Sequence, residues 1–418
     1  MSGIRVWKVL LGVERHVVIE GVELEVADDG EATLVASVRP TKRRTSRCGQ
    51  CLRGCPGYDR GDGRRRWRGL DLGSTRVFLE AEAPRVRCRR HGVIVAAVPW
   101  ARHDSLFTKG FEDQTVWLAA HAAATTVAVL MRSSWRAVTG MVTRVVAEAR
   151  GKTDRLTGLT KIAIDEKAYR KGQRYLTVVT DVITGRVVWA AKGRSQASVE
   201  AFFTALGPER AAALTHVGCD GADWIHPVVT AKAPQALLCL DSYHVVAWAS
   251  EAVDEVRRRI VRDLKADGRA EEATALKGSR WAVLKNPRNL TGGQSESLAS
   301  IKATNAPLYR AYLIKEQLRE VFRVKGKRGR RLLAGVIAWA SRSRLPEMVD
   351  LARKLRRFTD LIGNTLDHNV TSALAENTNT HISVLTRRAY GFHSPEALIA
   401  MIELTRGGLC PPLPGRAG

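Results

Sequence analysis

The stretch Leu159–Gly193, LTKIAIDEKAYRKGQRYLTVVTDVITGRVVWAAKG, is expected to organise the fold of this chain. Its β-branched residues predict strands at Lys161–Ile164, Tyr175–Val182 and Arg186–Ala191. A Thr-Gly pair separates the last two runs, so these should form a hairpin. We therefore expect an antiparallel start to a sheet.

Asp165 and Glu166 follow the first of these strands directly. A carboxylate at the end of a rigid strand is well placed to hold a metal ion, because little conformational freedom is left to lose. The alternative is that the two acids form only the polar end of a strand.

Two later runs also end at an aspartate. Thr215–Cys219 leads to Asp220, and Ala236–Leu240 leads to Asp241, each after a helical segment. Hairpin strands followed by strands joined through helices predict a mixed α/β sheet. Asp165 and Asp220 end neighbouring strands in this arrangement, so their side chains should converge.

The charge of the chain indicates a polyanionic partner. The 418 residues are 45% hydrophobic and carry 67 Lys and Arg against 42 Asp and Glu, a net charge of +25. Nucleic acid is the usual partner of such a surplus, and the alternative is a merely soluble basic surface. The longest apolar run, Val116–Met131, is short for a membrane span, and the N-terminal apolar run is short for a signal peptide. We expect a cytoplasmic, nucleoid-associated protein without a membrane partner.

The cysteines indicate a metal site, because disulfides are rare in a reducing compartment. Cys48 and Cys51 form a C-x-x-C pair, and Cys88 and His91 form a C-x-x-H pair. Two such knuckles supply the four ligands of a tetrahedral zinc and predict a zinc ribbon. Cys55 could substitute for Cys51, and scattered buried cysteines are the alternative.

Two segments near these knuckles suit DNA. The basic stretch Arg60–Arg68 suits phosphate contacts, with a solvated loop as the alternative. Phe111–Met131 and Trp135–Arg150 predict two helices around a short turn, which suggests a helix-turn-helix or a plain αα-hairpin. The candidate phosphate contacts are Arg64, Arg65, Arg66 and Arg68, and the candidate base contacts are Arg136 and Arg144.

The chain after Asp241 reads as a long helical excursion with a basic run at Lys325–Arg331. A further predicted helix, Ala373–Leu385, carries Glu376. Arg387 and Arg388 follow it and are candidate DNA contacts.

These motifs together resemble the ISL-three family of insertion-sequence transposases. The matching residues are Asp165-Glu166 with Arg170-Lys171-Gly172, Asp220, Asp241-Ser242-Tyr243-His244, and Glu376-Asn377 leading into Arg387-Arg388-Ala389-Tyr390-Gly391-Phe392. The resemblance implies a ribonuclease-H-like catalytic domain with a DDE triad of Asp165, Asp220 and Glu376. Asp241 is the rival for the second position.

The resemblance also implies cofactors and partners. Two Mg²⁺ ions, with Mn²⁺ as a substitute, would bind the triad, and a structural Zn²⁺ would bind the knuckles. The partners would be transposon ends and target DNA, bound by a homodimer or higher oligomer. The alternatives are a catalytically silent, transposase-derived DNA-binding protein and a structure-specific nuclease.

The expected organisation is multidomain. It comprises a β-rich lead-in at 1–45, a zinc ribbon at 46–103, a helix-turn-helix at 104–150, a catalytic domain at 159–244 and 362–405, and a helical insertion at 245–361.

Overall fold

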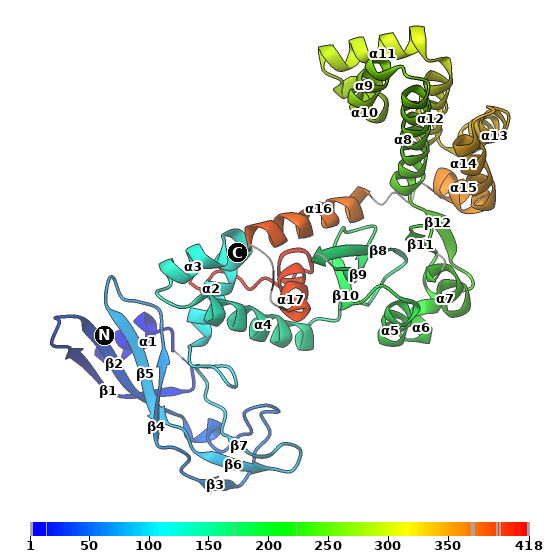
Figure 1. The fold of residues 1–418 in the computed structure, drawn as a ribbon. Coiled ribbons are helices and arrows are strands. Elements are labelled where there is room, and N and C mark those ends of the chain that lie inside the picture. Colours follow the sequence, from blue (N-terminus) through cyan, green and yellow to red (C-terminus); the bar gives the residue numbers. More distant parts are fainter. Residues whose placement is uncertain are drawn as a thin grey trace. The chain divides into compact units, whose positions relative to one another are not determined.

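The computed structural model of the chain describes residues 3–13, 15–170, 172–222, 224–368, 373–389, 392 and 394–415. It separates into two compact units (Figure 1). Unit 1 comprises Met1–Asp154 and Thr386–Gly418, and unit 2 comprises Arg155–Leu385. No helix among the described residues is long and apolar enough to cross a membrane.

Unit 1 begins with a helix and two β-sheets. The helix is α1 (Gly3–Leu10), and the first sheet has the order β1-β2-β5-β4, from β1 (Val17–Val26), β2 (Ala32–Pro40), β4 (Arg64–Arg68) and β5 (Arg76–Glu82). The second sheet has the order β3-β6-β7, from β3 (Gly57–Asp59), β6 (Arg85–Cys88) and β7 (Gly92–Val95).

The expected lead-in at 1–45 is not separate from the ribbon region that follows it. β2 pairs with β5 in parallel, and β5 pairs with β4, so both predicted segments share one sheet. Trp67 on β4 and Leu79 on β5 are buried in the same core as Val17 on β1. The lead-in strands need these partners, because two strands alone bury too little apolar surface to be stable.

The helical part of unit 1 contains α2 (Lys109–His121), α3 (Ala124–Leu130), α4 (Trp135–Lys152) and α17 (Pro395–Arg406). The single helix expected at Phe111–Met131 is interrupted, because the backbone is extended at Ala122 and Ala123. α4 agrees with its prediction and begins at the N-cap Ser134, whose side chain accepts a hydrogen bond from the N–H of Ala137.

The last helix differs from its expected domain. Residues 362–405 were expected to complete the catalytic domain, but α17 buries Ala400 and Leu404 in the core of α2, α3 and α4. Glu403 is also buried and pairs with Arg150 of α4. The apolar face of α17 therefore belongs to unit 1, and a fragment ending at residue 150 would leave that core open.

Unit 2 contains a five-stranded mixed sheet of the order β10-β9-β8-β11-β12. Its strands are β8 (Lys161–Arg170), β9 (Arg174–Asp181), β10 (Val187–Lys192), β11 (His216–Cys219) and β12 (Leu237–Leu240). β8, β9 and β10 are antiparallel, and β11 runs parallel to both β8 and β12. The expected mixed sheet is confirmed, but β8 continues six residues past Ile164 because β9 pairs with it there.

One face of this sheet packs against three helices. They are α5 (Gln196–Leu206), α6 (Pro208–Ala212) and α7 (Ile225–Lys232). Ile162 and Ile164 of β8 share a buried core with Phe202 of α5 and Val228 of α7. Successive side chains of a strand point to opposite faces, so Ala163 and Asp165 belong to the other face.

The remaining helices of unit 2 form a bundle and one further helix. The bundle comprises α8 (Ser242–Ala266), α9 (Ala270–Gly278), α10 (Arg280–Leu284), α11 (Gly292–Thr304), α12 (Ala306–Val324), α13 (Gly326–Ser341), α14 (Pro346–Arg357) and α15 (Thr359–His368), and α16 (Ala373–Arg388) follows. α15 returns to the sheet, where the hydroxyl of Thr365 donates to the carbonyl of Leu240 at 2.7 Å. The bundle therefore begins and ends at β12, as an insertion should.

Candidate functional site

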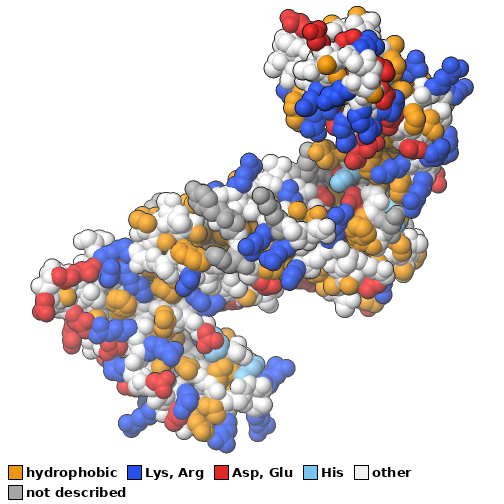
Figure 2. All heavy atoms as spheres, in the orientation of Figure 1, with side chains coloured by type: hydrophobic (Ala, Val, Ile, Leu, Met, Phe, Trp, Pro, Cys, Tyr) orange, Lys and Arg blue, Asp and Glu red, His pale blue; other side chains and the backbone are white. Residues whose placement is uncertain are grey.

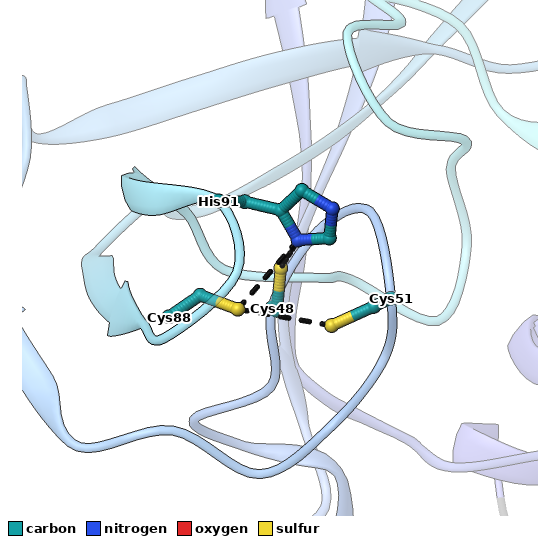
Figure 3. A group of neighbouring side chains, drawn as sticks. All are labelled: Cys48, Cys51, Cys88 and His91. Atoms are coloured by element: carbon teal, nitrogen blue, oxygen red, sulfur yellow. Dashed lines mark hydrogen bonds between the residues drawn. The ribbon is translucent and has the colours of Figure 1, made fainter.

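The two predicted knuckles form one cluster. Cys48, Cys51, Cys88 and His91 each present a ligand atom, and these four atoms lie within 4.8 Å of one another (Figure 3). Among the described side chains, this is the single group of three or more such ligands that converge. β6 supplies Cys88, and the tight turn before β7 supplies His91.

The spacing of these atoms fits a tetrahedral zinc ion. The Sγ atoms of Cys51 and Cys88 are 3.8 Å apart, and Nδ1 of His91 lies 3.4 Å from Sγ of Cys48 and 3.6 Å from Sγ of Cys88. Zinc–ligand bonds of about 2.0–2.3 Å require edges close to these values. The backbone N–H groups of Arg90 and His91 lower the pKa of the Cys88 thiol to about 6, which favours the thiolate that zinc binds.

Cys55 is not part of the converging group. Its thiol donates instead to the carbonyl of Arg53 at 3.4 Å, and burial raises its pKa. Cys51 therefore supplies the second cysteine of the first knuckle, as predicted.

The aspartates of unit 2 occupy equivalent positions on three adjacent strands. Ile164 of β8 is opposite Cys219 of β11, and Cys219 is opposite Leu240 of β12. The next residue along the chain is Asp165, within β8, Asp220, directly after β11, or Asp241, directly after β12. Neighbouring strands are about 4.8 Å apart, so the backbone of Asp165 is one strand from Asp220 and two from Asp241.

α16 contacts the first of these aspartates. The side-chain amide of Asn379 donates a hydrogen bond to Oδ2 of Asp165, and the N–H of Glu166 donates to Oδ1 at 2.7 Å. Sequence reasoning missed Asn379, since an amide in the middle of a helix carries no local signal. Ile382 and Leu385 on the same helix are buried.

Asp165 is electrostatically coupled to its neighbours. Burial raises its pKa, and the charges of Asp241 and Asp220 raise it further, whereas the N–H of Glu166 and the charge of His244 lower it. Asp241 acts on Asp165 more strongly than Asp220 does, although the strand order places Asp220 nearer. Asp241 has a structural role as the N-cap of α8, where its carboxylate accepts a hydrogen bond from the N–H of Tyr243 at 2.9 Å.

Glu166 has a different environment from Asp165. Its carboxylate accepts a hydrogen bond from Nε1 of Trp224 at 2.9 Å and pairs with Arg194. The Arg194 guanidinium lies 4.9 Å from the ring of Tyr175 and 5.0 Å from that of Trp224. Burial and the charge of Asp220 raise the pKa of Glu166 to about 7. The carboxylate of Glu166 is therefore occupied by its contacts with Arg194 and Trp224.

Parts of the C-terminal motif fall outside this description. Glu376 lies in α16, but its side chain is outside the described residues, as are Tyr390 and Gly391. Arg387 and Arg388 form the last turn of α16, where Arg387 is exposed and Arg388 is half-buried.

The predicted phosphate contacts on β4 are mostly engaged within the protein. Arg64 and Arg66 each donate to the carboxylate of Glu80 at 2.7 Å. Arg68 is buried and pairs with Asp71. These three lie on a strand rather than in the solvated loop that was the alternative, and their guanidinium groups pair with acidic side chains of the protein. Arg65 is half-buried and lines a hollow of about 470 Å³ beside the first knuckle.

The predicted base contacts on α4 also differ from each other. Arg144 donates to the fully buried carboxylate of Glu112 at 2.8 Å, and Arg102 donates to the same carboxylate at 3.1 Å. Arg136 is exposed at the start of α4, with its guanidinium 5.4 Å from the ring of Trp135. Arg136 therefore remains a candidate, whereas Arg144 holds α4 against α2.

Comparison with known proteins agrees with these features. The family model of the ISL3 type, described as a transposase, matches residues 162–402. A second model, described as the zinc-finger of transposases IS204, IS1001, IS1096 and IS1165, matches residues 44–91.

Two curated relatives cover nearly the whole chain. The transposase for insertion sequence element IS1557 of Mycobacterium tuberculosis is 48% identical over 436 residues, which cover 100% of this chain and 98% of the relative. The transposase for insertion sequence element IS1001 of Bordetella parapertussis is 28% identical over 387 residues, which cover 92% and 94%. The chain belongs to the ISL3 family of insertion-sequence transposases, and its Cys/His cluster lies in the zinc-finger region of that family.

Proposed function

We propose that this transposase binds the ends of its insertion sequence, cuts DNA there and joins the ends to target DNA with a DDE triad. Asp165, Asp220 and Glu376 form the triad, in a domain of the ribonuclease-H-like type. The observation that carries this proposal is the strand register, which aligns Asp165 with Asp220 on adjacent parallel strands. The hydrogen bond from Asn379 to Asp165 also supports it, because Asn379 lies on α16, the helix that contains residue 376.

Glu376 is the third member because of its position on α16. It lies three residues before Asn379, and residues three apart occupy the same side of a helix. Asp165 would be the central ligand, flanked by Asp220 and Glu376.

The donor set suits Mg²⁺, which prefers carboxylate oxygens. Two Mg²⁺ ions, when bound, would activate the attacking oxygen and stabilise the leaving oxygen. Burial raises the pKa of Asp165 in the free protein, so the ionised form is costly there, and a nearby cation offsets that cost. The surrounding Lys and Arg residues would hold the DNA phosphates.

Replacing Asn379 with Ala should weaken divalent-metal binding about 10-fold, because residues that orient a metal ligand typically contribute 10–100-fold to affinity. The amide of Asn379 fixes the carboxylate of Asp165. Titration calorimetry with Mn²⁺ on the full-length protein measures this. Asn377→Ala, an exposed neighbour on the same helix, is the matched control. Equal affinity in Asn379→Ala and wild type would show that Asn379 only docks α16.

DNA-end recognition is assigned to unit 1. We propose that α3, the turn at residues 131–134 and α4 act as a helix-turn-helix, with α4 in the major groove. Arg136, Thr139 and Thr143 lie on one side of α4, away from the buried Val138 and Val142. The zinc ribbon would support this contact, and two copies of the chain would bring two ends together.

Arg136→Ala should reduce the preference for end DNA over scrambled DNA by about 10-fold, because a base contact contributes roughly 1–3 kcal/mol. Arg144→Ala should instead leave that preference intact and destabilise unit 1 by about 1–3 kcal/mol, since buried Glu112 loses a partner. Competition binding and thermal unfolding of the full chain separate the two. The assignment fails if Arg144→Ala alone loses the preference.

A cleavage assay tests the proposed activity as a whole. The inverted repeats that flank the coding region supply the substrate, and Mg²⁺ is added or withheld. Strand cuts at the repeat ends that require Mg²⁺ support a transposase. Specific binding without any cut indicates a silent DNA-binding protein, and cuts that ignore the repeats indicate a structure-specific nuclease.

A further inference from the structure

A basic groove lies on the helical bundle of unit 2, far along the chain from the zinc region. It is a hollow of about 640 Å³ between α8, α9 and α14. Arg258, Arg262 and Lys265 line it from α8, and Lys277 lines it from α9. The α8 positions are four and three residues apart, which places them along one side of that helix.

Two acidic residues beside the groove, Asp254 and Glu347, are already engaged, whereas Glu255 lines the groove as an exposed carboxylate. Asp254 is buried and accepts hydrogen bonds from Arg257 at 2.9 and 2.7 Å, with Arg258 at 3.4 Å and Arg280 at 3.7 Å. Glu347 accepts from Arg259 at 2.7 Å. One buried carboxylate thus faces three guanidinium groups, which leaves the groove strongly positive.

Three of the groove cations form no ion pair with a described acidic residue, although the charge of Arg262 lowers the pKa of Glu347. Within the described part of the chain, no ion pair includes Arg262, Lys265 or Lys277, although all three side chains are exposed. Exposed like charges on one face repel one another, so a fixed set of them is stabilised by a polyanion.

The whole bundle shares this bias. Residues 242–368 contain 26 Lys and Arg against 14 Asp and Glu, a net charge of +12 out of +25 for the chain. Figure 2 shows Lys and Arg side chains crowded on the visible face of the bundle. Nearly half of the excess charge therefore lies outside both the zinc region and the carboxylate site.

The groove dimensions suit a DNA backbone. Arg258 and Lys265 are seven residues apart, about 10.5 Å along the helix axis. Successive phosphates of one strand of a duplex advance about 3.4 Å along its axis, so this row spans about three phosphates. The lining contains no aromatic side chain on which a base could stack, which favours a duplex over a single strand.

We infer that this groove binds the phosphate backbone of double-stranded DNA without reading its sequence, as a second DNA contact separate from the end-reading surface of unit 1. The inference rests on the proposed function, which makes DNA the substrate. Arg262, Lys265 and Lys277 contact phosphates directly, and Asp254 holds Arg258 and Arg257 in place behind them.

The test is the salt dependence of duplex binding by the full-length chain. The variant combines Arg262→Ala, Lys265→Ala and Lys277→Ala. Each neutralised phosphate contributes about 0.9 to the slope of log affinity against log salt, so the slope should fall by about 2.7. End DNA and scrambled DNA should weaken equally, by about 10-fold or more at roughly 150 mM salt.

A matched control removes the same charge elsewhere on the bundle. It combines Arg323→Ala, Arg342→Ala and Arg353→Ala, whose side chains are exposed and lie outside the groove. Its slope should stay within about 0.5 of wild type, since none of these residues is expected to meet a phosphate. Equal slopes in wild type and the groove variant would overturn the inference and point to an acidic protein partner instead.

The two proposals fail in different ways. If the wild-type chain does not bind end DNA more tightly than scrambled DNA, the proposed function is contradicted. The comparison of salt slopes on scrambled duplex still tests whether the groove binds DNA phosphates. If the triple variant does not fold, Lys265→Ala alone removes one exposed charge and should lower the slope by about 0.9. No change in that single variant would also overturn the inference.

Discussion

Asp165→Asn is expected to abolish strand cleavage, by more than about 1000-fold, or about 4 kcal/mol of transition-state stabilisation. The substitution keeps the size of the side chain and removes the charge that would hold both metal ions. Asn at this position has one acceptor oxygen, so it can keep the hydrogen bond from Asn379 but not the one from the N–H of Glu166 as well, and α16 should move little. Gel-based cleavage of end DNA measures the loss, and affinity for the same DNA should change little.

Companion variants test the other two proposed metal ligands. Asp220→Asn and Glu376→Gln should match the loss in Asp165→Asn, and Asp241→Asn should leave more activity. Asp241 is the informative comparison because its charge acts on Asp165 while its side chain caps α8. If Asp241→Asn is inactive and Asp220→Asn cuts normally, Asp241 is the second carboxylate.

Cys88→Ser is expected to remove zinc from the chain and to unfold the β3-β6-β7 sheet. Cys88 is buried, and its Sγ lies 3.8 Å from Sγ of Cys51 and 3.6 Å from Nδ1 of His91. A sheet of three short strands has little core of its own, so zinc binding provides much of its folding free energy, about 10–16 kcal/mol in isolated zinc fingers. Elemental analysis should give one zinc per wild-type chain and none in the variant, and limited proteolysis should cut between residues 46 and 95.

Cys55→Ser is the control for this experiment. Its thiol is outside the converging group, so the variant should keep its zinc and its protease resistance. Zinc retained in Cys51→Ser but lost in Cys55→Ser would make Cys55 the fourth ligand.

Features encoded over a few residues were predictable. The spacing of Cys48 with Cys51, and of Cys88 with His91, identified all four residues of the cluster. The apolar runs before Asp165 and Asp220 predicted two strands, and the register confirms that these are neighbours, although β8 continues past Asp165. Short spacings and β-branched runs act through local backbone geometry, which the sequence contains directly.

Features that depend on distant partners were not predictable in the same way. Arg144 looked free for DNA, but it meets Glu112, which lies 32 residues earlier on another helix. Arg64 and Arg66 formed a basic stretch in the sequence and proved to face Glu80 across a strand pair. Whether a charged side chain is free to bind DNA depends on whether an opposite charge lies beside it. Only the folded chain determines which charges are neighbours.

The sequence by itself determined the family, the four residues of the Cys/His cluster, the excess of positive charge and the strand order of the mixed sheet. Tertiary structure alone decided that Asp165 meets Asn379 while Glu166 pairs with Arg194, and that α17 completes the core of unit 1. It also decided that Arg262, Lys265 and Lys277 line one groove. The physical reason is that strand alternation and helix periodicity are local, whereas burial, ion pairing and the separation of charges depend on segments far apart in the chain.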